Sequence, residues 1–372
     1  MKKKFVSKFH EGDFGMIITT IILSLFGLIM VFSASYYTGL SKYGDPVYFL
    51  KDDLKWMILG WIAFLVCSFI DYHFLKWLAI PAILIGFVLL GLIWTPLGIT
   101  INNATRWLDF KLFTVMPGEV IKTCIILFFA WLYSTKMDLK DKKFVNALPG
   151  LGITGLAFIL VFKQPNFSTA GIVALIGIGV MFLAGLSISW IVFGGAAAVA
   201  GVGALVFMKG GYMLERITGF WDPFADSLGK GYQVAQGLLA FGSGGVTGLG
   251  LGKSVQKALY LPEPMNDFIL PIIGEELGFI GVTALIAVFI VLVWRIFTVS
   301  IHAKDKFGML LAGGVAMHLA LQVIINIAVV TASFPPTGVV LPLISLGGTA
   351  TILMMAELGI AYNVSKQTRV TL

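Results

Sequence analysis

Ten apolar stretches, each long enough or nearly long enough to cross a bilayer as a helix, dominate this chain of 372 residues. A membrane-spanning helix needs about 20 apolar residues, and fewer when neighbouring helices bury its ends. The expected spans are residues 15–36, 54–70, 74–94, 118–133, 145–162, 168–186, 188–208, 268–297, 308–334 and 341–364. The sequence therefore predicts an all-α integral membrane protein, with about ten transmembrane helices in one polytopic domain over residues 1–372.

Composition supports lipid as the solvent for most of this chain. Hydrophobic residues make up 58% of the sequence and charged residues only 12%, too much apolar surface for one water-soluble core. The net charge of +7 is interpreted as topological, because Lys and Arg are retained on the cytoplasmic side, and no nucleic-acid partner is expected. Cys67 and Cys124 both lie in apolar runs without metal-ligand spacing, so neither a disulfide nor a zinc site is expected.

The basic residues also predict an orientation. Clusters at residues 2–8, 136–143, 295–306 and 366–369 fall on one side of the membrane under this span count, which puts both termini in the cytoplasm. The Lys-rich start resembles a signal peptide, but the apolar run after it lacks a cleavage site and is expected to remain as the first span. Residues 95–117 and a large loop at 209–267, between helices 7 and 8, are then expected outside. The large loop contains several aromatic residues, and we expect it to be folded.

Ionisable groups at membrane depth are costly and are therefore candidates for function. Glu119 and Lys122 lie three residues apart at the start of the fourth span, as a structural ion pair or as part of a site. Asp267 opens the eighth span, where it could be a general base or a helix N-cap. In the ninth span His318, Gln322 and Asn326 form one polar stripe, which would bind neighbouring helices or a substrate.

Cations expected outside the membrane could hold an anionic headgroup, or could simply be solvated. They are Arg106, Lys111, Arg216, Lys230, Lys253 and Lys257. The glycine-rich run 242–252 ends in Gly-Lys-Ser like a phosphate-binding loop, but Thr247 stands where that motif needs glycine and no strand precedes it. A nucleotide site is therefore not expected, and no metal-ligand motif is present.

Several motifs resemble one family in order and spacing. The main blocks are RITGFWDPFADSLGKGYQ (216–233), QK (256–257), YLPE (260–263), NDF (266–268) and GEELGFIG (274–281). Supporting blocks are RW (106–107), PGE (117–119) with Lys122, QP (164–165), NIAVV (326–330), PTG (336–338), LPLIS (341–345) and GG (347–348). Together they resemble the SEDS (shape, elongation, division and sporulation) family of bacterial membrane proteins, and the FtsW/SpoVE branch more than the RodA branch.

The resemblance implies a peptidoglycan glycosyltransferase of the cytoplasmic membrane that polymerises lipid II at the outer face, in cell division, cell shape or sporulation. It implies a class B penicillin-binding protein as partner, together with membrane lipid. Asp267 matches the family's essential aspartate and would be the catalytic base. The expected substrate-binding residues are Arg106, Glu119, Lys122, Arg216, Gln233, Lys257, Glu263 and Ser345. No metal site is assigned, although carboxylates such as Asp267 and Glu263 could hold Mg²⁺ or Mn²⁺ against a pyrophosphate.

Some positions depart from the family pattern. Asn166 and Ser168 replace an Asp and a Gly, Met116 and Gly118 replace a Gln and a Ser, Leu346 replaces a Tyr, and Thr349-Ala350 replaces a Ser pair. Two alternatives therefore stay open. One is a lipid II flippase, for which the polar stripe would supply a path, and the other is a scaffold for the partner synthase that has lost its own chemistry.

Overall fold

Apolar helices make up most of the structure, a computed structural model that describes residues 11–101, 104–111, 113–139, 144–190, 223–224, 229 and 231–368. The helices of the first half are α1 (Phe14–Tyr43), α2 (Tyr48–Phe69), the short 3₁₀ helix η1 (Tyr72–Phe74), α3 (Leu75–Leu92), α4 (Pro117–Thr135), α5 (Phe144–Phe162) and α6 (Phe167–Leu183). Those of the second half are α9 (Tyr232–Gly244), α10 (Ile269–His302), α11 (Lys306–Val330) and α12 (Gly348–Ser365).

The expected spans overlap these helices wherever the structure describes them, although α1 ends seven residues after the predicted residue 36 and α2 begins six residues before the predicted residue 54. Among the described residues, six helices are long and apolar enough to cross a membrane, and the predicted integral membrane class is confirmed. The expected span 188–208 lies almost wholly outside the described residues, so the number ten stays a prediction. The last span was placed seven residues too early, because Pro342 and the left-handed Leu343 (φ 63°) form a turn before α12 begins at Gly348.

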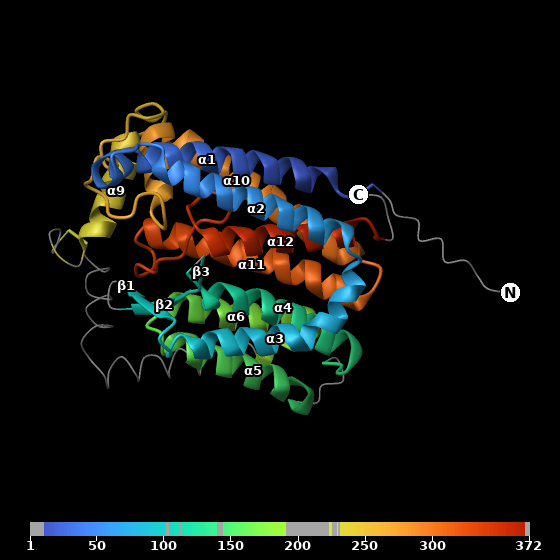
Figure 1. Ribbon diagram of the computed structural model, residues 1–372. Helices are drawn as coiled ribbons and strands as arrows, with labels where there is room; N and C mark the ends of the chain where they lie inside the picture. Colours follow the sequence, from blue (N-terminus) through green and yellow to red (C-terminus); the bar gives the residue numbers. More distant parts are fainter. Residues whose placement is uncertain are drawn as a thin grey trace.

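The long helices lie side by side with nearly parallel axes, and α12 packs against α2, α10 against α11, and α3 against α4 (Figure 1). The first and last helices meet at one end of this bundle. There the backbone N–H of Asp13, the N-cap of α1, donates to the side chain of Ser365 at the end of α12 (2.9 Å). The opposite end carries α9 and a small sheet. The first and last helices therefore begin and end at the same end of the bundle, and the cytoplasmic placement of the termini stays a prediction.

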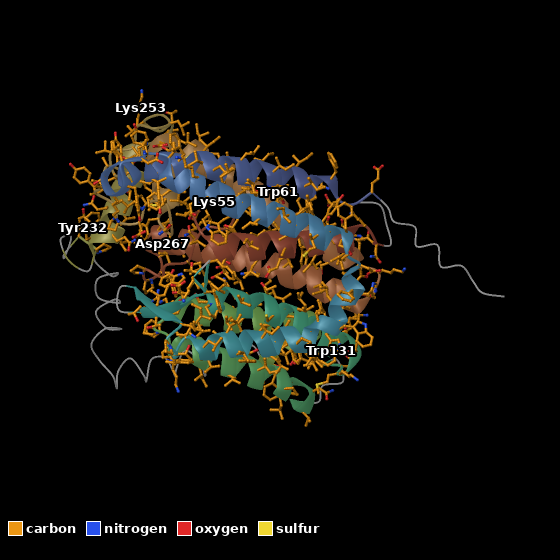
Figure 2. The ribbon with its side chains drawn as sticks, in the orientation of Figure 1. Lys55, Trp61, Trp131, Tyr232, Lys253 and Asp267 are labelled. Carbon is orange, nitrogen blue, oxygen red and sulfur yellow. The ribbon has the colours of Figure 1, made fainter. Side chains whose placement is uncertain are left out.

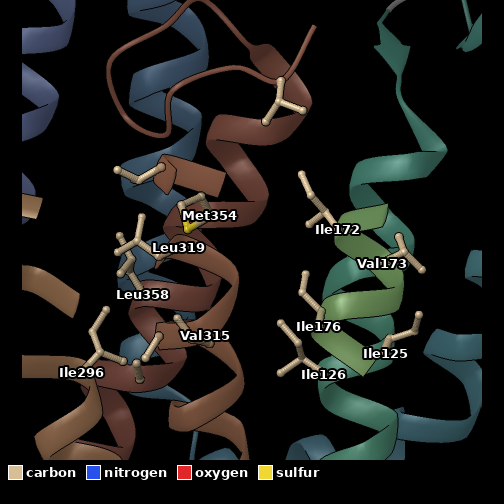
Figure 3. Close-up of a cluster of buried hydrophobic side chains, with 14 of the residues drawn as sticks. Ile125, Ile126, Ile172, Val173, Ile176, Ile296, Val315, Leu319, Met354 and Leu358 are labelled. Atoms are coloured by element: carbon tan, nitrogen blue, oxygen red, sulfur yellow. The ribbon is translucent and has the colours of Figure 1, made fainter. Parts of the chain in front are cut away.

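The centre of the bundle is apolar and tightly packed. Ile126 of α4 and Ile176 of α6 face Leu319 of α11 and Leu358 of α12 across it (Figure 3). Because lipid is as apolar as these side chains, close approach rather than water exclusion stabilises helix pairs in a bilayer. The glycines of α11 permit such an approach to α4 and α10.

The segment between α3 and α4 forms a feature that the sequence analysis did not predict. Strands β1 (Gly98–Ile101), β2 (Ala104–Asp109) and β3 (Thr114–Val115) make an antiparallel sheet in the order β1-β2-β3. Ile99 pairs with Trp107, and Asp109 pairs with Thr114. The sheet lies at the bundle end opposite the chain termini and delivers β2 next to the start of α4 (Figure 1).

Helix α10 is broken at Gly278, and the glycine-rich run fills the break. Gly278 has φ 66° and ψ −169°, which L side chains rarely adopt. The freed backbone groups are paired: the N–H of Phe279 donates to Gly245, and Glu275 accepts from Leu249, both at 2.9 Å. A Cβ on Gly248 would lie 2.2 Å from the Glu276 carbonyl oxygen. The glycines thus allow one backbone to lie against another at membrane depth, where every polar group needs a partner.

Candidate active site

A cavity of about 600 Å³ opens at the end of the bundle that carries α9 and the sheet. Five of the residues predicted for the site line it: Arg106, Glu119, Gln233, Glu263 and Asp267. They come from β2, α4, α9 and the segment before α10, which are far apart in the sequence. Figure 2 shows Asp267 and Tyr232 near this end and Trp131 at the other.

Asp267 precedes α10 without capping it. The N-cap position belongs to Phe268, which makes no side-chain capping hydrogen bond, so Asp267 does not occupy the N-cap position. The backbone carbonyl of Asp267 is instead held by the amide of Asn326 (2.9 Å), which also donates to the Val339 carbonyl (2.7 Å). One amide on α11 therefore joins the residue before α10 to the segment of Gly338 and Val340, which also lines the cavity.

Arg106 and Asp267 face the same point. A Cβ built on Gly338 would lie 3.9 Å from Nη1 of Arg106 and 4.0 Å from Oδ2 of Asp267. Gly338 has φ 72°, and its missing side chain leaves the space in front of both groups open. The guanidinium of Arg106 also donates to the Pro165 carbonyl, which connects β2 to the turn before α6. A carboxylate and a cation thus share one open space.

Glu119 and Lys122 form an ion pair beneath the cavity, with Nζ and Oε2 separated by 2.6 Å. Lys122 is completely buried, and its ammonium also donates to Oε1 of Gln322 (3.2 Å). Glu119 lines the cavity, whereas Lys122 lies below it as the countercharge. The pair keeps a wall that would otherwise be anionic close to neutral.

The rim opposite this wall comes from the segment before α10. Oε2 of Glu263 accepts from the amide of Asn266 (2.6 Å), and Gln233 donates to the Pro262 carbonyl (3.5 Å). Ser345 is buried, and its hydroxyl accepts from the Leu341 N–H (2.9 Å). Ser345 thus shapes the turn that leads into the cavity wall. Within the part of the chain that the structure describes, no three carboxylate, His or Cys groups gather closely enough to hold a metal ion.

Besides Lys122 and Ser345, one more of the described site residues, Lys257, does not line this cavity. Lys257 is buried, and its ammonium pairs with Oε1 of Glu276 (2.6 Å) and donates to the Ser33 hydroxyl (2.9 Å). It lines a separate cavity of about 430 Å³ beside the second half of α1. Arg216 lies outside the described residues.

The structure also adds cavity residues that sequence reasoning missed. Asp52 and Trp56 of α2 line the cavity, and so does Thr337. For Asp52 and Trp56 the sequence did offer a signal, because charged and aromatic residues stand at the start of an otherwise apolar span. Of the departures from the family pattern, Leu346 lines the cavity, with its N–H bonded to the Met265 carbonyl (2.9 Å). Asn166 is buried near the start of α4, where its amide lies 3.6 Å from a Cβ built on Gly118.

Comparisons with known proteins agree over nearly the whole chain. The family model described as "cell cycle protein", of the FtsW, RodA and SpoVE type, matches residues 14–370. A probable peptidoglycan glycosyltransferase FtsW of Geobacter sp. strain M18 is 38% identical over 96% of this chain and 98% of its own length. Stage V sporulation protein E of Bacillus subtilis strain 168 is 37% identical, with coverage of 98% and 99%.

A solved chain from a study of how a peptidoglycan synthase complex coordinates polymerization and crosslinking has the same fold. Its TM-score is 0.78 at 24% identity, with 95% of this chain and 97% of that chain covered.

Proposed function

The chain belongs to the FtsW/RodA/SpoVE family of cell cycle proteins, and on that basis we propose that it is a peptidoglycan glycosyltransferase that polymerises lipid II. Relatives that bear the glycosyltransferase name are similar over nearly their full length. The observation that carries the site assignment is that Asp267 and Arg106 face one open space beside Gly338. Acceptor and donor sugars would meet in this space, on the outer face of the bacterial cytoplasmic membrane, with both termini in the cytoplasm.

In the proposed reaction Asp267 is the general base. Its carboxylate takes the proton from the 4-hydroxyl of the acceptor sugar, and that oxygen attacks the anomeric carbon of the donor. The new glycosidic bond forms as the bond to the polyprenyl diphosphate breaks, so the configuration inverts and the diphosphate leaves with the electron pair. The carboxylate needs only to reach the hydroxyl, because both sugars are held by the cavity.

Charge develops on the diphosphate as its bond breaks, and fixed cations stabilise it. Arg106 is the cation best placed for this task, since it shares the open space with Asp267 and offers a planar pair of N–H donors. The Glu119–Lys122 pair keeps the floor of the cavity from repelling the diphosphate. Gln233, Glu263 and the turn held by Ser345 would shape the rim, and Arg216 is proposed as a further cation. No step is routed through a metal ion.

We further propose that the chain works with a class B penicillin-binding protein that crosslinks the new strands. The solved chain with the same fold comes from a complex in which polymerization and crosslinking are coordinated, which supports a comparable pairing here.

The test is polymerisation of purified lipid II by this protein with its partner synthase, comparing wild type with Asp267→Asn. Removal of a general base typically lowers the rate by about 10²–10⁴-fold, so glycan strands should be lost in the variant. Asp109→Asn is the matched control, because Asp109 lies exposed at the same end but does not line the cavity. Full activity of folded Asp267→Asn would remove Asp267 from the chemistry. An inactive wild type that still moves lipid II across liposomes would favour the flippase.

A further inference from the structure

His318 and Glu357 form a buried pair in the apolar centre of the bundle, far below the cavity rim. Nδ1 of His318 and Oε2 of Glu357 are 2.7 Å apart, and each side chain is at most 2% exposed. Their helix neighbours Leu319 and Leu358 belong to the apolar cluster of Figure 3. A buried pair of this kind contributes little net stability, because desolvation offsets most of its attraction. The burial of the His318–Glu357 pair therefore suggests that it has a role other than stabilising the fold.

The pair belongs to a ring across three helices that is made of two groups of polar contacts, Thr123–Glu357–His318 and Lys122–Gln322, joined through the backbones of α4 and α11. Oε1 of Glu357 on α12 accepts from the hydroxyl of Thr123 on α4 (2.5 Å), and Thr123 directly follows Lys122. His318 on α11 lies one turn before Gln322, which accepts from the Lys122 ammonium (3.2 Å). The ring thus reaches Lys122 from both sides.

These polar contacts fix the rotation of each helix about its own axis. Apolar side chains alone give membrane helices little reason to prefer one rotation over another close to it, whereas a buried polar contact fixes it. Lys122 has a flexible stem of four carbons whose rotamer freedom must be restricted before its charge has a fixed position. The contacts of Thr123 and Gln322 set the positions of α4 and α11 around that stem. The Lys122 ammonium, which is the countercharge of Glu119, is then held in one position beneath the cavity.

We propose that the His318–Glu357 pair is a positioning pair for Lys122, and through Lys122 for Glu119 in the wall of the cavity. The inference rests on the proposed function for its kinetic consequence. It assigns to α12 a role in catalysis although Glu357 touches neither the cavity nor the reacting groups. His318 and Glu357 lie 39 residues apart in the sequence, and we infer that they act together to hold Lys122 in position.

The experiment replaces both members by apolar residues of similar size, His318→Leu with Glu357→Met. Such an exchange of a buried pair is often neutral or stabilising, so the variant is expected to fold. We expect kcat for lipid II polymerisation to fall about 10–100-fold, as small displacements remote from the chemistry can cause. KM should change much less than kcat, because the additional negative charge on the diphosphate develops only in the transition state. Met354→Leu, on α12 but outside the ring, is the control and should keep wild-type kinetics.

A folded double variant with wild-type kcat would overturn the inference. If the double variant does not fold, Thr123→Val cuts the link between Glu357 and α4 with little change of shape, and the same criterion applies to it. Reductive methylation of Lys122, measured by mass spectrometry on the purified protein, tests the positioning of Lys122 without any need for glycan polymerisation. Lys122 is fully buried in the wild type and should become reactive in the variant. If the wild type itself makes no glycan, the proposed function fails, and unchanged Lys122 protection would then overturn this inference as well.

Discussion

Replacing Asn326 with leucine should disable the cavity while the rest of the bundle stays folded. The amide of Asn326 donates to the carbonyls of Asp267 (2.9 Å) and Val339 (2.7 Å), and the Asn side chain is 1% exposed. Leucine has a similar shape but no donor. An unpaired buried carbonyl typically destabilises by about 1–3 kcal/mol, and the Asp267 bond is only partly buried, so the two losses together come to about 2–4 kcal/mol.

This loss falls on two neighbouring segments that both line the cavity, at Asp267 and at Gly338–Val340. Both carbonyls lie outside helical segments, with Asp267 just before α10 and Val339 in the turn region before α12. We therefore expect a shift of about 1 Å in the Asp267 carboxylate rather than global unfolding. A displacement of that size can lower the rate about 100-fold. The assay is lipid II polymerisation at equal folded protein, together with the melting temperature in detergent.

The matched control is Thr331→Val at the end of the same helix. The Thr331 hydroxyl is exposed and donates to the Ile327 carbonyl of its own helix (2.8 Å), so its removal should change stability by less than about 0.5 kcal/mol. If folded Asn326→Leu polymerises lipid II at the wild-type rate, Asn326 does not position Asp267, and the reasoning from these two hydrogen bonds is wrong.

Three further outcomes are expected. Lys257→Met should destabilise the protein by about 3–5 kcal/mol in thermal unfolding, because Glu276 keeps a buried charge without its partner, and Lys257→Met with Glu276→Gln should recover much of this. Gly338→Ala should lower kcat/KM without loss of folding, because alanine is strained at φ 72° and its methyl enters the open space of the site. Burial acts to raise the pKa of Asp71, but the hydrogen bonds from His73 outweigh it and hold that pKa below its usual range. The carboxylate therefore stabilises the fold above about pH 4 and loses this contribution as the pH falls further, which melting of Asp71→Asn against wild type across pH 3–6 would measure.

The sequence predicted what depends on local length and hydropathy. Apolar runs identify helices because each must cover the same thickness of hydrocarbon, and α1 to α6 lie close to the predicted spans. The break at Gly278 could not be predicted, since it exists only because residues 244–250 supply the missing backbone partners. The turn at residues 341–347 was merged into a span for a similar reason, because its hydropathy resembles that of a helix.

Site residues could be predicted where several motifs meet at one cavity. They could not be predicted where the role of a side chain depends on which other side chain it contacts. The motif resemblance identified Arg106 and Asp267, which line one cavity. Lys257 also belongs to a motif, yet its ammonium is committed to Glu276, a contact that follows from the fold of the preceding loop. Glu357 was not singled out, although a lone carboxylate in an apolar span was a visible signal. Its partner His318 is 39 residues away, and only the rotation of two helices brings them together.

The stripe on α11 distinguishes the enzyme from the flippase that the sequence left open. A flippase needs polar groups that a headgroup can contact along a path through the membrane. Here His318 contacts Glu357, Gln322 contacts Lys122, and Asn326 holds two backbone carbonyls, so each member of the stripe is engaged by the protein itself. The three side chains also follow one another along α11, from His318 in the bundle centre to Asn326 beside Asp267 at the cavity. A polar stripe used in this way supports a reactive site at one membrane surface, because its three side chains are buried in contacts within the protein and do not line an open path for a lipid headgroup.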